Sequence, residues 1–267
     1  MVGIALPGRG SIGGQPKRLE VEAPQMTDFF TMLPGETAAP VPPGPALSTG
    51  STGIKRVHRF LRWAYDEAPG LVRSVAPGDT ARAAYVGGVL GHFAQVLLVH
   101  QQGQDLFVYP QLAERAPASR PHVKQMLEHH RQIRERVEAL EPVRKRWMQA
   151  ADAVGREELA QGYEDVRSLL HEHLRREVTE VMPAVDRVVT EEELMEMIQH
   201  GVRQHDKKFL VTYLGMILAT NPPDDRRAIF FDEIPAPARL GYRLIGRRMY
   251  RRQYATLFPG RPVPETL

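Results

Sequence analysis

Two stretches of this 267-residue chain decide its fold: HQQGQDLFVYP at residues 100–110 and HLRREVTEVMP at residues 173–183. Each stretch opens with a histidine and closes with a proline ten positions later, and neither contains a proline or a turn signal in between. A proline that ends a long periodic pattern marks the end of a helix. The two stretches are therefore predicted to be the last turns of two equivalent helices, each with its histidine about 15 Å before the proline.

The segment before each stretch repeats as well. VHRFLR at residues 57–62 precedes the first and EHHRQI at residues 128–133 precedes the second. His58 lies 42 residues before His100, and His130 lies 43 residues before His173. This repeat predicts a duplicated helical hairpin, which folds most simply into a four-helix bundle with the four histidines at one level.

Apolar residues recur at intervals of three and four along most of the chain, and almost no segment has the alternation of a strand. The sequence thus predicts an all-α fold, an antiparallel up-down four-helix bundle with additional C-terminal helices. The expected helices cover residues 53–74, 80–109, 121–151 and 157–182, followed by 191–198, 207–219, 224–231 and 236–257.

Three parts are expected along the chain. Residues 1–53 are rich in Pro and Gly and have no helical or strand period, so they are predicted to be disordered. Residues 54–193 form the bundle, and residues 194–267 form a helical extension packed on it. Met26 is a possible alternative start.

Composition excludes several classes of function. The chain has no cysteine, which excludes disulfides, thiolate ligands and cysteine nucleophiles. Its net charge of +3 gives no reason to expect a nucleic-acid partner. No apolar run approaches the roughly 20 residues that span a bilayer, and the first residues do not resemble a secretory signal, so a cytoplasmic location is expected. Hydrolase and nucleotide-binding fingerprints are absent.

The convergent histidines indicate a metal site. Glu177 follows His173 by one helical turn, so both side chains face the same side of their helix. Imidazole and carboxylate together suit iron, manganese or zinc. The duplicated position in the first half holds Gln104 rather than a carboxylate. A single core histidine is usually structural, but four at duplicated positions are better explained by a metal.

At these motifs the sequence resembles the hemerythrin-like, or HHE cation-binding, family over residues 54–193. The tail, with FLVTYLGMIL at residues 209–218, resembles extensions of actinobacterial members. The resemblance implies a four-helix bundle that holds non-haem iron and binds dioxygen, senses oxygen or redox state, or handles peroxide or nitric oxide.

Carried over by position, His58, His100 and His173 resemble the ligands of one iron, with Glu177 shared between two irons. His130 resembles a ligand of the second iron, and its neighbour His129 is the alternative if the helix is rotated. Members of the family commonly have His or Glu after the first histidine of the second helix and Glu at the fifth position. This chain has Gln101 and Gln104 there.

Loss of the second carboxylate disfavours a closely spaced pair of ferrous ions. Three arrangements are compatible with the sequence. Asp105 rotates into the site, with Gly103 easing the distortion; or one metal is held by His58, His100, His173 and Glu177; or the site holds no metal. We rank a mononuclear or weakened dinuclear iron site first.

The leading functional hypothesis is a metal-binding protein for dioxygen, peroxide or nitric oxide, and whether it is an enzyme is left open. The alternative is a helical scaffold or partner-binding protein with a degenerate site, and simple metal sequestration is a third possibility. Residues 239–252 are basic and amphipathic; contact with an anionic membrane is considered, but the preferred interpretation is an arginine face in solvent on a docked helix. The sequence does not indicate the oligomeric state.

Overall fold

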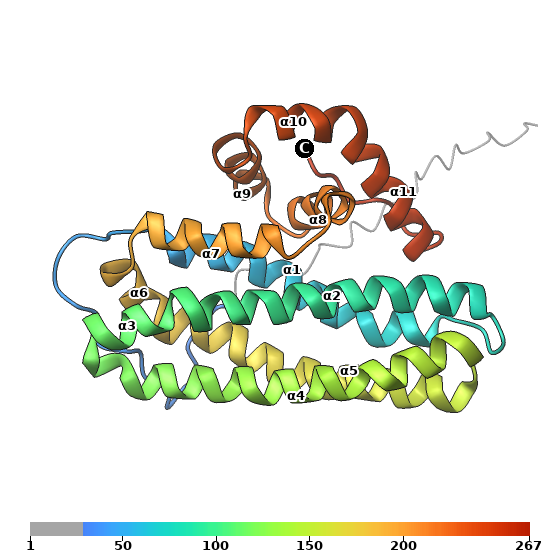
Figure 1. The fold of residues 1–267 in the computed structure, drawn as a ribbon, viewed down its shortest axis with the longest axis horizontal. Helices are drawn as coiled ribbons and strands as arrows, with labels where there is room; N and C mark the ends of the chain where they lie inside the picture. The colour runs from blue at the N-terminus through green and yellow to red at the C-terminus, as the bar shows by residue number, and fades with distance from the viewer. Residues whose placement is uncertain (1–28) are drawn as a thin grey trace, which may run out of the picture.

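The computed structural model describes residues 29–267, and within that range it contains helices and no strand. Four long helices form an antiparallel up-down bundle: α1 (Gly50–Arg73), α2 (Thr80–Phe107), α4 (Arg120–Ala150) and α5 (Ala153–Arg176). α1 and α4 each pack against both α2 and α5 (Figure 1). The predicted fold class is confirmed.

Local signals explain where these helices begin. The Asp79 side chain accepts a hydrogen bond from the Arg82 amide at the start of α2, and Asp152 does the same for Gly155 at the start of α5. Such caps satisfy backbone N–H groups that have no partner inside the helix. Between α4 and α5 the chain turns at Ala151, whose φ of 46° is left-handed. Short connections of this kind keep consecutive helices antiparallel.

The inner faces of the bundle are apolar and fully buried. Phe60 and Leu61 of α1 meet Leu90 and Phe93 of α2 in one continuous core. Burying each such side chain contributes roughly 1.5–3 kcal/mol of transfer free energy. This core holds the four helices rigidly at the depth where the histidines lie.

The two prolines of the duplicated stretches act differently from each other. At Pro110 the first helix breaks, so that α2 ends at Phe107 and a short α3 (Tyr109–Arg115) follows, before the turn η2 (Pro117–Ser119). Near Pro183 the second helix widens instead. α5 passes into a π-helical turn, η3 (Glu177–Val181), and then into α6 (Met182–Val188). The predicted end at residue 109 lies two residues beyond the end of α2. The predicted end at residue 182 is wrong, because the chain stays helical through α6 to Val188.

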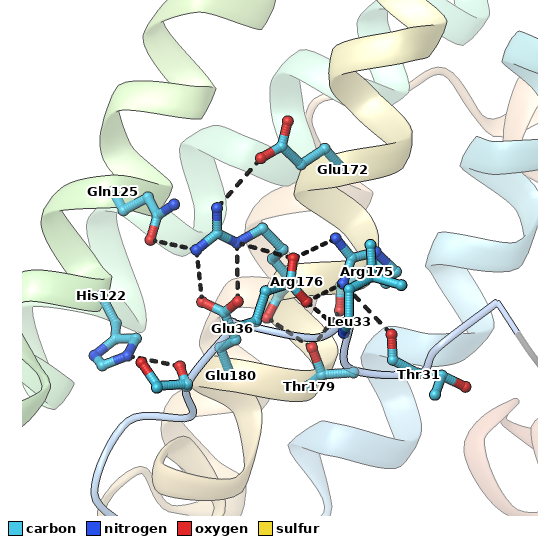
Figure 2. A network of polar contacts seen from close by, with 11 residues as sticks. Thr31, Leu33, Glu36, His122, Gln125, Glu172, Arg175, Arg176, Thr179 and Glu180 are labelled. Carbon is cyan, nitrogen blue, oxygen red and sulfur yellow. Dashed lines mark hydrogen bonds and ion pairs between the residues drawn. The ribbon is translucent and has the colours of Figure 1, made fainter.

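Residues 29–49, which we call the N-terminal arm, have no regular secondary structure but are not disordered. The Ala39 amide donates to the Glu180 carbonyl at 2.7 Å, and the Leu47 amide donates to the Asp186 carbonyl at 2.7 Å. Glu36 forms an ion pair with Arg175 inside a larger polar network (Figure 2). The expectation of disorder is therefore wrong for residues 29–53, because long-range polar contacts order a segment that lacks periodicity. Residues 1–28, including Met26, lie outside the described part.

The C-terminal helices lie along one side of the bundle (Figure 1). α7 packs on α2, α8 packs on α1, and the last helix packs on α8. The Arg82 guanidinium of α2 donates to the Leu257 carbonyl at 2.6 Å, which fastens the end of the chain to the bundle. The elements are α7 (Glu191–Arg203), α8 (Lys207–Ala219), α9 (Pro223–Ala228), η4 (Ile229–Glu233), α10 (Ala236–Gly241), η5 (Tyr242–Gly246) and α11 (Arg247–Leu257).

The amphipathic segment at residues 239–252 does not dock through its aliphatic residues. Leu240, Leu244 and Ile245 are 59%, 70% and 62% exposed. Tyr242 and Tyr250 are buried in their place. The π-helical turn η5 lies within this segment, so the period of the helix is not constant between these two tyrosines.

One helical stretch, Thr80–Arg115, is long and apolar enough to cross a membrane by length and composition, in contrast to the sequence expectation. In the structure this stretch is α2 and α3, and it packs against α1, α4 and α7. A helix that packs against several neighbours is apolar because much of its surface faces other helices, and 44% of the apolar window is buried inside this structure.

Candidate metal centre

Four histidines from four helices meet inside the bundle. His58 and His173 are completely buried, His130 is 1% exposed, and His100 lies at the edge of the bundle beside His58, with ring centroids 5.4 Å apart. Their equivalent positions in the duplicated hairpins bring them to one level. The cluster lies between the apolar core of α1 and α2 and the end of the bundle where α3 and α6 pack.

Glu177 is the carboxylate at the centre of this cluster, and it is completely buried. Its Oε2 lies 3.2 Å from His58 Nε2 and 3.5 Å from His173 Nε2. His58, His100 and Glu177 each offer a ligand atom, and these atoms lie within 4.8 Å of one another. Adjacent ligands on a metal with bonds of about 2.1 Å are roughly 3.0–3.4 Å apart, so the separations of 3.2 Å and 3.5 Å at Glu177 Oε2 suit an ion.

The two oxygens of Glu177 have different surroundings. Oε1 accepts a hydrogen bond from the Tyr109 hydroxyl at 2.7 Å and another from the Gln104 side-chain amide. Oε2 has no hydrogen-bond partner, although His58 and His173 are near it. The carboxylate therefore presents one oxygen to the histidines and has its other oxygen held by two donors.

Comparison with known proteins agrees with this geometry. The model of the hemerythrin HHE cation-binding domain matches residues 49–185, about half of the chain. The chain belongs to the hemerythrin HHE family. No curated protein and no solved structure matches it. Membership in this family implies a helical protein that binds a metal, and the His–His–Glu cluster is where its candidate ligands are gathered.

The ring orientation of His58 suits the metal-binding role known for hemerythrin domains. Its Nδ1 lies 3.1 Å from the Leu174 carbonyl, an acceptor, so Nδ1 carries the proton. Nε2 then keeps a lone pair that faces the cluster. Hydrogen bonds from the remote ring nitrogen commonly orient histidine ligands in this way.

Asp105 orients the ring of His130 and does not itself point to the cluster. Asp105 Oδ1 lies 2.6 Å from His130 Nδ1, and Arg134 holds the other Asp105 oxygen at 3.2 Å. His130 Nε2 points to His173 Nε2 at 3.2 Å. In this structure Asp105 therefore does not rotate into the site to replace the missing bridge, and it contacts His130 and Arg134 instead. Glycine at position 103 is explained by packing instead: an added Cβ would come within 2.9 Å of Met197, where α7 crosses α2.

The other residues considered from sequence are distributed around this centre. His129 is 8% exposed, and its ring centroid lies 5.9 Å from that of His173, whereas His130 makes the direct contact. Gln101 is completely buried, and neither of its amide atoms has a partner. Sequence reasoning left Tyr109 outside the site, although it donates to Glu177. Its place just before the helix-breaking Pro110 was the available signal.

Burial sets the protonation of the cluster. Burial first, and then the neighbouring His58, lower the pKa of His100 to about 3. Burial and the nearby His130 likewise hold the pKa of His173 well below its usual value. For Glu177 burial raises the pKa, but contact with His58 and the surrounding imidazoles outweighs it and leaves the pKa below the usual range. Neutral imidazoles beside an ionised carboxylate are the forms that metal ligands adopt.

These residues fit one metal ion better than two. His58 Nε2, His100 Nε2 and Glu177 Oε2 are buried without hydrogen-bond partners, and a bound ion would satisfy all three. A second ion would need another carboxylate to offset the repulsion between two cations. The positions that would supply it hold Gln101 and Gln104, and Gln104 instead donates to Glu177. The donor set therefore does not fit a closely spaced iron pair.

Proposed function

We propose that this chain binds a single non-haem iron ion through His58, His100, His173 and Glu177 and uses it to bind or sense dioxygen, or to handle peroxide or nitric oxide. The observation that best supports the proposal is that the two carboxylate oxygens of Glu177 have different neighbours. Two donors hold Oε1, so one oxygen is left to face the histidines. The C-terminal helices, which the family match does not cover, support the further proposal that the chain groups with actinobacterial members.

Each residue around the cluster has a defined task in this proposal. The Leu174 carbonyl fixes the tautomer of His58. Burial raises the pKa of Tyr109, so its hydroxyl keeps a proton to donate to Glu177. Asp105 fixes the proton of His130 on Nδ1, so the lone pair of His130 Nε2 faces the cluster beside His173 Nε2, and with iron bound no proton would remain between the two nitrogens. Bound iron would supply the redox-active centre for a small diatomic ligand or a peroxide.

The fold excludes water from the side of the centre formed by His58, His173 and Glu177. His58, His173 and Glu177 have no exposed surface, and Leu61, Leu97 and Leu170 of the surrounding helices are equally buried. A low-dielectric surrounding strengthens the interaction of an ion with its ligands. It also limits the ligands that enter to small molecules or to those that fit the adjoining cavity described below.

The decisive experiment is metal analysis of protein produced with iron supplied, together with its optical spectrum. We expect close to one iron per chain and no absorption from an oxo-bridged pair. Two irons per chain with that absorption would refute the mononuclear proposal.

His173→Ala is the matching variant, and we expect it to lose most of the iron. His171→Ala is the control, because His171 lies on the same helix but contacts Asp66 on the outer face. If the wild type holds no metal and His173→Ala is as stable as the wild type, metal binding is rejected and the scaffold alternative is favoured.

A further inference from the structure

A cavity of about 560 Å³ lies between the bundle and the C-terminal helices. α1 and α2 form one wall, and α7, α8 and residues 229–242 form the other. Small-molecule sites in proteins commonly enclose about 300–1,000 Å³. The space is therefore large enough for an organic molecule, well beyond the size of dioxygen or peroxide.

The walls of this cavity are almost entirely apolar. Among residues 29–267, four charged, imidazole or amide side chains line it: Arg56, His100, Gln104 and Glu233. Arg56 pairs with Glu233 and also with Asp225, the latter at 3.1 Å, so the guanidinium charge is already compensated. The described lining residues therefore offer no free charge to an ionic ligand, and an uncharged apolar molecule fits best.

The inner end of the cavity meets the candidate metal centre. Gln104 lines the cavity and is 1% exposed. Its amide nitrogen is committed to Glu177, but its carbonyl Oε1 has no hydrogen-bond partner. A buried acceptor without a partner costs about 1–3 kcal/mol, so a hydroxyl donor brought by a ligand would be favoured there. A carboxylate would be disfavoured, because Oε1 repels it and Glu177 is close.

The other end of the cavity reaches the surface. Ile198 and Val202 of α7 both line it and are 49% and 50% exposed. Deeper lining residues such as Ile217 and Tyr242 are buried. A chain-like molecule can therefore enter beside α7 and extend inward to Gln104.

We infer that this cavity binds an uncharged, apolar molecule with one terminal hydroxyl group, in the manner of a medium-chain alcohol. The hydroxyl donates to Gln104 Oε1, and the alkyl chain lies along α7 and α8. This inference goes beyond iron binding, since the contacts that hold the alcohol belong to the protein alone.

The test is calorimetric titration with decanol and with methyl nonyl ether, which has the same number of heavy atoms but no donor. We expect decanol to bind about tenfold more tightly than the ether, as one hydrogen bond to a buried acceptor allows. Each further methylene in the alcohol should raise affinity about fourfold until the cavity is filled. No binding, or equal binding of alcohol and ether, would overturn the inference.

Two variants test the placement. Gln104→Leu removes the acceptor, so it should bind decanol and the ether equally while keeping the increment per methylene. Gly53→Leu should weaken decanol binding more than tenfold, because Gly53 lines the cavity and an added Cβ meets no atom within 4 Å. Gly70→Leu is the control: Gly70 lies on the same helix, is equally open, and does not line the cavity.

Iron content is measured on the same samples, and the titrations are repeated after chelation. Decanol should bind the metal-free protein as well, so failure to hold iron and failure to bind alcohol are separate results. If Gly53→Leu binds decanol as tightly as Gly70→Leu does, the assignment to this cavity is wrong.

Discussion

The two helical hairpins of the bundle, α1–α2 and α4–α5, share a sequence pattern but contribute different groups to the metal centre. In the second hairpin the duplicated position is the first residue of η3, directly after α5, and holds Glu177, which supplies the negative charge. On α2 it holds Gln104, and the Tyr109 that follows shares its role; both donate hydrogen bonds to Glu177. One half provides the ligand, and the other half fixes the ligand in place.

The helix geometry differs in the same way. After Gln104 the chain breaks, so that Tyr109 begins a new helix and turns its hydroxyl toward Glu177. After His173 the chain stays helical but widens, and the Met182 amide bonds to the Glu177 carbonyl across five residues. Wide turns of this kind are frequent at functional sites. A duplicated hairpin can therefore keep equivalent histidines while one half supplies the carboxylate and the other half supplies the hydrogen-bond donors to it.

The largest effect is expected from Glu177→Gln, which removes the negative charge that the second hairpin supplies. Iron affinity should fall by more than about 100-fold, since even residues that only orient a ligand are worth about 10–100-fold. Glu180→Gln is the matched control, because Glu180 lies in the same wide turn and is buried, but pairs with Arg176. Competition titration against a chelator measures both. Equal affinities in the two variants would contradict the assignment of Glu177.

Making the two halves alike with Gln104→Glu should raise the iron content from about one toward two per chain. Without metal, two facing carboxylates replace a hydrogen-bonded pair, and stability should fall by about 1–3 kcal/mol. Denaturant unfolding with and without iron measures this, and iron should restore the loss. Gln102→Glu adds the same charge on the exposed face of α2 and should change neither quantity. An unchanged iron content in Gln104→Glu would show that the missing bridge is not the limiting defect.

Removing one support with Tyr109→Phe should weaken iron binding by about tenfold, because Glu177 Oε1 loses one of its two donors. Tyr163→Phe is a suitable control, since Tyr163 is buried in the bundle and contacts Tyr65 rather than the cluster. Chelator competition again gives the affinity. A full loss of iron would instead assign Tyr109 a role as direct as that of Glu177.

The smallest expected effect concerns the N-terminal arm, where hydrogen bonding by Arg175 lowers the pKa of Glu36 to about 2. A carboxyl whose folded pKa is depressed adds stability above its unfolded pKa of 4.5, and that stability is lost as the pH falls toward 2. The wild type should therefore exceed Glu36→Gln by about 1 kcal/mol at pH 6 and by less at pH 3. Urea unfolding at both values measures the difference, and a constant difference would contradict the pairing.

Most of the fold follows from periodicity. The helix expected at residues 207–219 coincides with α8 (Lys207–Ala219), and the bundle helices differ from expectation by a few residues at their ends. The duplication also anticipated the meeting of the four histidines, because equivalent positions on paired helices lie at one depth. Local patterns suffice for these features.

The remaining features depend on contacts that no local pattern records. Glu36 and Arg175 are 139 residues apart, so the ordering of a proline-rich arm could not be read from its composition. The wide turns at Glu177 and Tyr242 change the phase of the helix, and a wheel of constant period places later residues on the wrong face. The cavity arises where separate helices fail to fill the space between them, which only their packing determines.

The N-terminal arm also covers the metal centre on one side. Its Phe30 lies against His58, with ring centroids 6.3 Å apart, whereas the apolar passage on the other side ends at His100 and Gln104. The arm therefore places an aromatic ring over the centre on the side of His58, whereas the passage leads to His100 and Gln104. A chain that begins at Gly50 would lack this cover, so the arm protects one side of a buried centre that the bundle helices alone leave without Phe30.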